Sequence, residues 1–189
     1  MTGYAAYDAY RRQVVTSLRG SVLEIGAGVG RNVALLPEGV TWQALEPDRR
    51  RHARLARIAR IHGAAIAPLQ ACAEQIPLPD ASVDGVLSVE TMCSVADAEL
   101  ALSEARRVLR PGGRFVFAEH VAAPAGTWSR RVQGALAPLS RRLDHGCNPL
   151  RETEATIRCS GLALREVRRF EVRQPLGVRV PYVVGVAVR

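Results

Sequence analysis

The residues with the clearest chemical pattern are an acid and a run of alternating glycines near the N-terminus. Glu24 is followed by Gly26, Gly28 and Gly30, and a second acid, Glu46, ends the next apolar segment. Glycine has no Cβ, so the backbone can turn tightly and approach a ligand closely. In a doubly wound sheet, an acid at the end of the second strand accepts hydrogen bonds from ribose hydroxyls. The pattern therefore predicts a site for a ligand that carries a ribose.

Position 31 distinguishes two such ligands. The dinucleotide fingerprint G-x-G-x-x-G needs a third glycine there, beside the pyrophosphate, whereas this chain has Arg31. S-adenosylmethionine (SAM) has no phosphate and brings a sulfonium cation and an amino acid group instead. Glu24 beside the glycines suits this cationic ligand better. We therefore favour SAM over NAD, with a ligand-free turn as the third alternative.

The elements that must position these residues alternate between strand-like and helix-like segments. Such alternation predicts an α/β fold in which helices cover both faces of a doubly wound, mostly parallel, seven-stranded sheet. No helix-length segment separates the last two strands, so the last strand should be antiparallel. The predicted strands are Ser21–Gly26, Val40–Glu46, Ala64–Ala71, Val83–Val89, Arg114–Glu119, Leu162–Phe170 and Tyr182–Val188. The predicted helices are Tyr4–Leu18, Asn32–Leu36, Asp48–His62, Ala96–Leu109 and Arg151–Cys159.

Two further segments precede the fourth and fifth predicted strands. They read EQIPLPDASVD from Glu74 and RVLRPGG from Arg107. With the glycine loop, they make the chain resemble the class I SAM-dependent methyltransferases over nearly its whole length. The residues of these segments are similar to those of the ubiquinone and menaquinone methyltransferase-like branch. The resemblance implies a Rossmann-like fold and SAM as methyl donor, with S-adenosylhomocysteine as product. The length of 189 residues and the 48% apolar content favour one domain over 1–189.

The resemblance also implies roles for single residues. The glycine loop would line the methionine part of SAM, Glu46 the ribose, and the segment 72–74 the adenine edge. Many relatives have Asp where this chain has Cys72, so the contact with the adenine amino group is in doubt. The residues after the fourth strand would border the sulfonium. The predicted cofactor-binding residues are Glu24, Gly26, Ala27, Gly28, Gly30, Asn32, Glu46, Pro47, Cys72, Ala73, Glu74, Ser88, Val89, Glu90 and Cys93.

Five shorter segments give a narrower resemblance, to the alkyl thiol S-methyltransferases of the methyltransferase-like group. They are Cys93–Val95, Glu119–Ala123, Thr127–Trp128, Gly146–Asn148 and Arg151–Glu152. The resemblance implies a small, fairly apolar acceptor with thiol sulfur as the favoured nucleophile. Methylation of nitrogen or oxygen in a metabolite, natural product or lipid amine is the alternative, because relatives of lipid-amine methyltransferases share these landmarks. An RNA methyltransferase or a non-catalytic SAM-binding protein comes last.

The acceptor side contains one candidate catalytic residue, His120. It follows the fifth predicted strand, at the edge where ligands of such sheets bind, and it could accept a proton, orient the nucleophile or only bind a loop. We interpret Cys147 as part of a pocket wall rather than as a nucleophile. Arg151 could bind an acidic group of the substrate or only start a helix. Tyr7 could close over the cofactor or pack in the core. The segment 121–150 is a predicted substrate lid or loop insertion, although it could instead lie on a lipid surface. The predicted substrate-binding residues are Tyr7, His120, Trp128, Cys147 and Arg151.

Composition limits the partners. The net charge is +8, and arginine provides all of the positive charge from Lys and Arg. Six of these arginines fall in the predicted helix Asp48–His62, the basic helix, which we interpret as a solvent-exposed face. We therefore favour a small-molecule partner over nucleic acid. The four cysteines are irregularly spaced without C-x-x-C, which predicts neither a metal site nor disulfides. No run of 18 apolar residues or leader pattern appears, so we expect a cytoplasmic protein. The arginines of the basic helix are Arg49, Arg50, Arg51, Arg54, Arg57 and Arg60.

Overall fold

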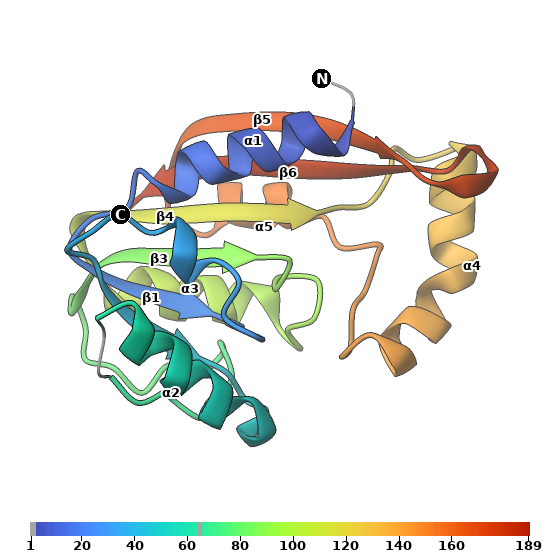
Figure 1. The fold of residues 1–189 in the computed structure, drawn as a ribbon. Helices are drawn as coiled ribbons and strands as arrows, with labels where there is room; N and C mark the ends of the chain where they lie inside the picture. The colour runs from blue at the N-terminus through green and yellow to red at the C-terminus, as the bar shows by residue number, and fades with distance from the viewer. Residues whose placement is uncertain (1–2, 64–65) are drawn as a thin grey trace.

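The computed structural model describes residues 3–63 and 66–189, and Figure 1 shows its single sheet covered by helices. The sheet has six strands in the order β2-β1-β3-β4-β6-β5. Strands β1 to β4 pair in parallel, whereas β6 is antiparallel to both β4 and β5, as predicted for the last strand. The strands are β1 Ser21–Ile25, β2 Thr41–Leu45, β3 Val83–Val89, β4 Leu109–His120, β5 Ala163–Arg173 and β6 Arg179–Val188. The α-helices are α1 Tyr4–Val15, α2 His52–Ile61, α3 Ala98–Val108, α4 Trp128–Leu143 and α5 Thr153–Cys159.

Helices cover both faces of the sheet, which confirms the doubly wound fold (Figure 1). Helix α1 packs Tyr7, Tyr10 and its valines on one face, and α2 covers the same face over β2 through Leu55 and Ala59. Helices α3 and α5 cover the other face. Asp97 caps α3 by accepting hydrogen bonds from the amides of Glu99 and Leu100, and the helix then buries one face rich in alanine.

The predicted seventh strand is the main difference in the sheet. Residues 64 and 65 of the predicted strand Ala64–Ala71 lie outside the described residues. In the rest of that segment, only Leu69 pairs with β2, through a single bridge to Leu45. The amide of Leu69 donates to Ala44 O, and its carbonyl accepts from Glu46 N, so Pro68 faces away from β2. The missing N–H of Pro68 suits the outer side of a sheet edge, and the described part of this segment continues the ladder no further.

Two of the predicted helices also differ from the prediction in type or extent. The predicted helix Asn32–Leu36 is a short 3₁₀ turn, Val33–Leu35, because Pro37 forces the residue before it to be extended. Asp48–His62 divides into a 3₁₀ turn, Arg49–Arg51, followed by α2.

Strand β4 starts at Leu109, earlier than the predicted Arg114. Leu109 pairs with Val83, and regular pairing resumes where Arg114 pairs with Gly85. The residues between form an irregularity in the ladder. The Pro111-Gly112-Gly113 segment that follows α3 therefore lies within β4.

Helix α4 lies beyond the carboxyl ends of the strands, beside the tip of the β5–β6 hairpin (Figure 1). Its buried residues include Ser129 and Gln133, which make polar contacts. The Ser129 hydroxyl accepts a hydrogen bond from the amide of Arg179, and the Gln133 amide group bonds both Ala123 N and Val121 O. The apolar residues Trp128, Val132, Leu136 and Leu139 all lie on this helix. Of these four, three are exposed: Trp128, Leu136 and Leu139.

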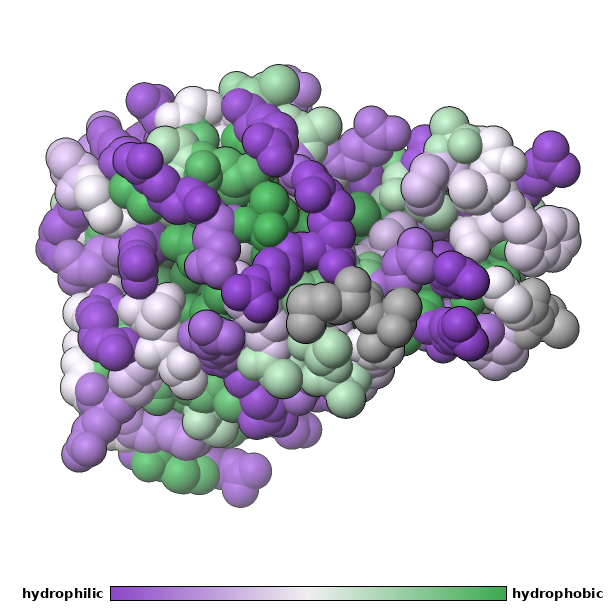
Figure 2. Space-filling model, turned by 90° about the horizontal axis from the view of Figure 1, so that it is seen from above, coloured by the Kyte–Doolittle hydropathy of each residue, from purple (hydrophilic) through white to green (hydrophobic). Residues whose placement is uncertain are grey.

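The surface is mixed in character. Figure 2, which views the molecule from above, shows hydrophilic side chains spread over the visible face with hydrophobic ones between them. Among the helices of residues 3–63 and 66–189, none has the length and apolar content needed to cross a bilayer.

Candidate active site

A cleft of about 810 Å³ opens at the carboxyl ends of the parallel strands, where ligands of such sheets bind. It brings together eight of the fifteen predicted cofactor residues, and the predicted catalytic residue His120 also lines it. The eight are Gly26, Glu46, Pro47, Cys72, Ala73, Glu74, Glu90 and Cys93. The other seven do not line it, namely Glu24, Ala27, Gly28, Gly30, Asn32, Ser88 and Val89.

Glu46 forms one wall of the cleft and is almost completely buried. Its Oε2 accepts a hydrogen bond of 2.8 Å from the amide of Gly28, and its Oε1 accepts one of 3.0 Å from the amide of Asp48. The glycine loop and the second strand therefore fix each other. Gly26 needs its positive φ of 63° and its lack of a side chain, because a Cβ would lie 2.5 Å from Thr91.

Glu24 lies beneath the loop instead of in the cleft. Its carboxylate accepts hydrogen bonds from Asn32 Nδ2 at 2.7 Å and Trp42 Nε1 at 2.8 Å. Burial raises the pKa of Glu24 to about 7, although these two hydrogen bonds act in the opposite direction. Glu24 and Asn32 thus hold the glycine loop from below.

Two acids organise the loop that follows β3. Glu90 adopts a left-handed conformation with φ of 53°, and its Oε1 accepts a hydrogen bond from the Tyr7 hydroxyl at 3.3 Å. Glu119 is fully buried and accepts from Ser88 Oγ at 2.6 Å and from the amides of Thr91 and Met92. Burial raises the pKa of Glu119 to about 7. This loop carries Cys93 into the cleft.

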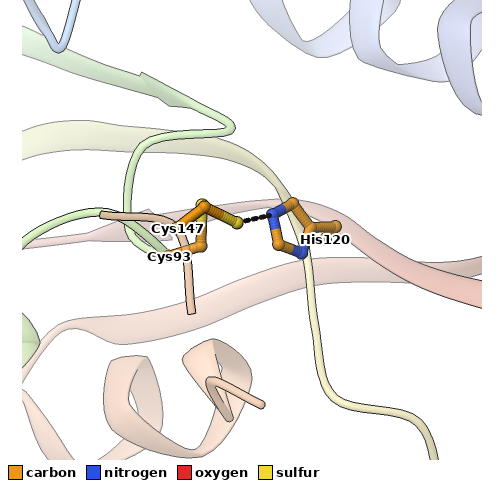
Figure 3. Close-up of side chains that lie close together, drawn as sticks. All are labelled: Cys93, His120 and Cys147. Carbon is orange, nitrogen blue, oxygen red and sulfur yellow. Dashed lines mark hydrogen bonds between the residues drawn. The ribbon is translucent and has the colours of Figure 1, made fainter. Parts of the chain in front are cut away.

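Three side chains from distant parts of the chain meet beside the cleft (Figure 3). Cys147 Sγ lies 3.3 Å from His120 Nε2, and the potential ligand atoms of Cys93, His120 and Cys147 all lie within 4.8 Å of one another. The thiols influence each other, because a hydrogen bond between them raises the pKa of Cys93 and lowers that of Cys147. Burial lowers the pKa of His120, but the neighbouring Cys93 together with the charges of Glu119 and Glu90 outweighs this effect, so the pKa is raised.

A second, mostly apolar cavity of about 400 Å³ adjoins this cluster. It lies between α4 and the β5–β6 hairpin, and its walls include Val132, Leu136 and Val180. His120 and Tyr182 line both this cavity and the cleft, so the two spaces meet at these side chains.

The predicted substrate residues are not all brought to this junction. Tyr7 is buried in the core under α1, and Trp128 is 61% exposed at the start of α4. Arg151 Nη2 donates to the carbonyl of Val95, and its Nε is buried without a hydrogen-bond partner among the described residues. Cys147 lines neither cavity wall but contacts His120. Of the five predicted substrate residues, only His120 therefore lines the junction, and Cys147 contacts it.

The sequence reasoning missed residues that cross the cleft. Arg51 Nη2 donates to His145 Nε2 at 2.8 Å, which links the start of α2 to the segment after α4. Thr91, Ser94, Asp144 and Tyr182 also line the cleft without having been predicted. Thr91 directly follows a predicted residue, Glu90, and Ser94 directly follows another, Cys93, so their positions were a usable signal. His145 also lies close to a predicted residue, Cys147, but its contact with Arg51 joins segments far apart in the sequence.

Comparison with known proteins decides the family. The family described as methyltransferase domain matches residues 23–117, a span that contains the glycine loop, Glu46 and most of β4. The chain belongs to the methyltransferase domain family. This membership confirms the predicted SAM-dependent methyltransferase class, its Rossmann-like fold and SAM as its cofactor.

Individual known proteins are similar to this chain over most of its length. Human thiol S-methyltransferase TMT1A is 30% identical over 182 residues, which cover 89% of this chain and 70% of the relative. Human thiol S-methyltransferase TMT1B is 30% identical over 166 residues, which cover 77% of this chain and 64% of the relative. The solved structure of a SAM-dependent methyltransferase from Thermotoga maritima has a TM-score of 0.64 at 26% identity, covering 96% of this chain and 88% of that one.

Proposed function

We propose that this methyltransferase transfers the methyl group of SAM to the sulfur of a small, fairly apolar thiol. The observation that carries the proposal is the junction at His120 and Tyr182, where the polar cofactor cleft meets a mostly apolar cavity. A methyl donor and an apolar acceptor can meet there. The similarity to two relatives named thiol S-methyltransferases supports sulfur as the nucleophile.

The chemistry asks little of the protein. SAM supplies both the reactive carbon and the leaving group, so the enzyme must align the reactants and exclude water. A thiol has a pKa of about 8.5 and ionises readily near neutral pH. A thiol acceptor therefore has less need of a strong dedicated base than an alcohol would.

On the donor side, we assign Glu46 to the ribose and the glycine loop to the methionine part. Cys72 and Ala73 lie at the adenine edge. The Glu74 carboxylate already accepts hydrogen bonds from the amides of Ala96 and Asp97, at 2.7 and 3.1 Å, and so holds the start of α3. Glu90 and Cys93 then border the sulfonium.

On the acceptor side, we assign the segment 121–150 to a lid within a single domain. Its helix α4 forms one wall of the apolar cavity through Val132 and Leu136. The link from Arg51 to His145 joins the end of this segment to the donor side. Closing the segment over both substrates would exclude water from the junction.

A small molecule is a better acceptor here than nucleic acid. Two arginines of the basic helix are already paired, since Arg50 contacts Asp48 and Arg51 contacts both Asp48 and Glu46. The four free cysteines support a reducing compartment, so we place the enzyme in the cytoplasm.

The test is an acceptor screen. Purified protein is incubated with SAM and with aliphatic thiols, amines, phenols and quinols, and the products are analysed by mass spectrometry for a gain of one CH₂. We expect apolar thiols to be methylated fastest. Preferential methylation of amines or phenols would contradict the proposal, and so would methylation of structured RNA alone. A protein that binds SAM in calorimetry but methylates nothing would be a non-catalytic SAM-binding protein.

A further inference from the structure

The cluster of Cys93, His120 and Cys147 has the composition of a metal site. We propose that these three side chains bind one Zn²⁺ ion and leave its fourth position open for the acceptor thiol, an inference that rests on the thiol acceptor proposed above. Two thiolates and one imidazole are ligands that zinc prefers, and three protein ligands with one open position are typical of catalytic zinc.

The observed geometry is close to what zinc requires. With Zn–S near 2.3 Å and Zn–N near 2.1 Å, tetrahedral ligands lie about 3.6 to 3.8 Å apart. Cys147 Sγ and His120 Nε2 are 3.3 Å apart, and all three ligand atoms lie within 4.8 Å of one another. Small side-chain rotations therefore suffice to bring the atoms to coordination distance.

The three ligands are held by contacts between their own loops. The amide of Asn148 donates to the carbonyl of Cys93 at 2.8 Å, which joins the segment containing Cys147 directly to the loop after β3. The buried carboxylate of Glu119 holds the same loop through the amides of Thr91 and Met92. Such supporting hydrogen bonds pre-organise a metal site.

The open position would face the reaction. Cys93 and His120 line the cofactor cleft, and His120 also lines the apolar cavity. A ligand on the fourth position can therefore extend into the apolar cavity while its donor atom faces the cleft. Two thiolates neutralise the ion, so a bound acceptor thiolate makes the centre anionic, opposite the cationic sulfonium.

The step balances without an oxidant or reductant. The acceptor thiol replaces water on zinc, its S–H bond breaks, and the proton leaves to solvent. The thiolate sulfur attacks the methyl carbon of SAM, and the carbon–sulfur bond of the sulfonium breaks with its electron pair going to the donor sulfur. The neutral thioether is a weak ligand, so it leaves and water returns. His120 then acts as a metal ligand rather than as the proton acceptor.

Metal content tests the site independently of activity. The full chain is purified from zinc-supplemented cells and measured by elemental mass spectrometry, and we expect one zinc per chain. Cys93→Ser and Cys147→Ser should each lose most of it. Cys159→Ser, at an exposed cysteine on α5, is the matched control and should keep it. Far-UV circular dichroism and urea unfolding show that each variant is folded.

Cobalt substitution reports the open position. The Co²⁺ protein should show thiolate-to-cobalt charge transfer and four-coordinate visible bands, and these bands should shift when an apolar thiol is added without SAM. Wild-type protein that takes up neither metal, or whose Cys93 and Cys147 are joined in a disulfide, would overturn the site. Bands that do not respond to any thiol methylated by the enzyme would overturn the open position.

Activity separates this inference from the proposed function. Zinc-free protein, prepared with a chelator, should methylate thiols at least tenfold more slowly than zinc-loaded protein, and added Zn²⁺ should restore the rate. Equal rates would overturn the zinc role while leaving thiol methylation intact. Stoichiometric zinc with no methylation of any thiol would instead contradict the proposed function.

Discussion

The cofactor cleft and the apolar cavity meet at His120, yet they are built in different ways. Most of the cleft wall comes from the ends of parallel strands and the short loops that follow them, such as the segments 45–51 and 71–74. The apolar cavity is formed by α4 and by the hairpin residues 174–182, which are far from each other in sequence. The methyl donor is therefore bound by short segments that each follow a parallel strand, whereas the acceptor pocket depends on packing between segments that are far apart in the sequence.

The largest effect is expected at Glu24, beneath the glycine loop of the donor side, in the dependence of the free energy of unfolding on pH. Burial raises the pKa of Glu24 to about 7 from 4.5. Below pH 4.5 the Glu24 carboxyl is protonated in both the folded and the unfolded chain, so its burial does not lower the free energy of unfolding. As pH rises from 4.5 to 7, the unfolded chain releases this proton first, so this group lowers stability by about 3 kcal/mol. Glu24→Gln cannot titrate, and it should lose that part of the pH dependence.

The measurement is urea unfolding of both proteins at several pH values between 5 and 8. Glu24→Gln should be less stable than the wild type at low pH, because an amide accepts only one of the hydrogen bonds from Asn32 and Trp42. Its disadvantage should shrink as pH rises. Parallel stability curves for the two proteins would contradict the raised pKa.

The second effect is expected in the cleft itself. Glu46→Ala removes the proposed ribose contact and should weaken SAM binding by about 2 kcal/mol, or roughly thirtyfold, in calorimetry. Glu46→Gln keeps one acceptor oxygen and should lose less. The KM for the thiol should change little, because Glu46 does not line the apolar cavity. An unaltered SAM affinity in the Ala variant would show that the ribose binds elsewhere.

The third effect is expected in the apolar cavity, where a substitution should change the KM for the thiol and leave SAM affinity unchanged. Val180→Asp places a charge in the wall and should raise the KM for apolar thiols about tenfold, since the lost burial is worth about 1.4 kcal/mol. SAM affinity should stay the same. Leu139→Asp is the control, because Leu139 is exposed on α4 and lies outside the cavity wall. If the control variant has the larger effect, the acceptor binds on the outer face of α4.

The smallest effect is expected at the adenine edge. Cys72 is exposed and lines the cleft. Cys72→Asp supplies a carboxylate that can accept from the adenine amino group, and it should tighten SAM binding about fivefold. Cys72→Ser is the matched control with a weaker acceptor. Weaker binding by the Asp variant than by the Ser variant would place adenine away from residue 72.

Sequence by itself determined the donor side of this protein. The glycine spacing, Glu46 and the alternation of strands and helices are local features, and local spacing fixes which residues reach the carboxyl ends of neighbouring parallel strands. Eight of the fifteen predicted cofactor residues line the cleft for this reason. Others, such as Glu24 and Asn32, support the loop from below, because period and spacing do not show which side of a tight loop faces the ligand.

Only the tertiary structure decided the acceptor side. The irregular cysteine spacing gave no sign that Cys93 and Cys147 meet at His120, or that Arg51 reaches His145 across the cleft. The buried positions of α4 include Ser129 and Gln133, whose polar groups pair with β6 and the segment after β4. Contacts between residues far apart in the chain set these positions, and no local pattern records which distant segments will meet.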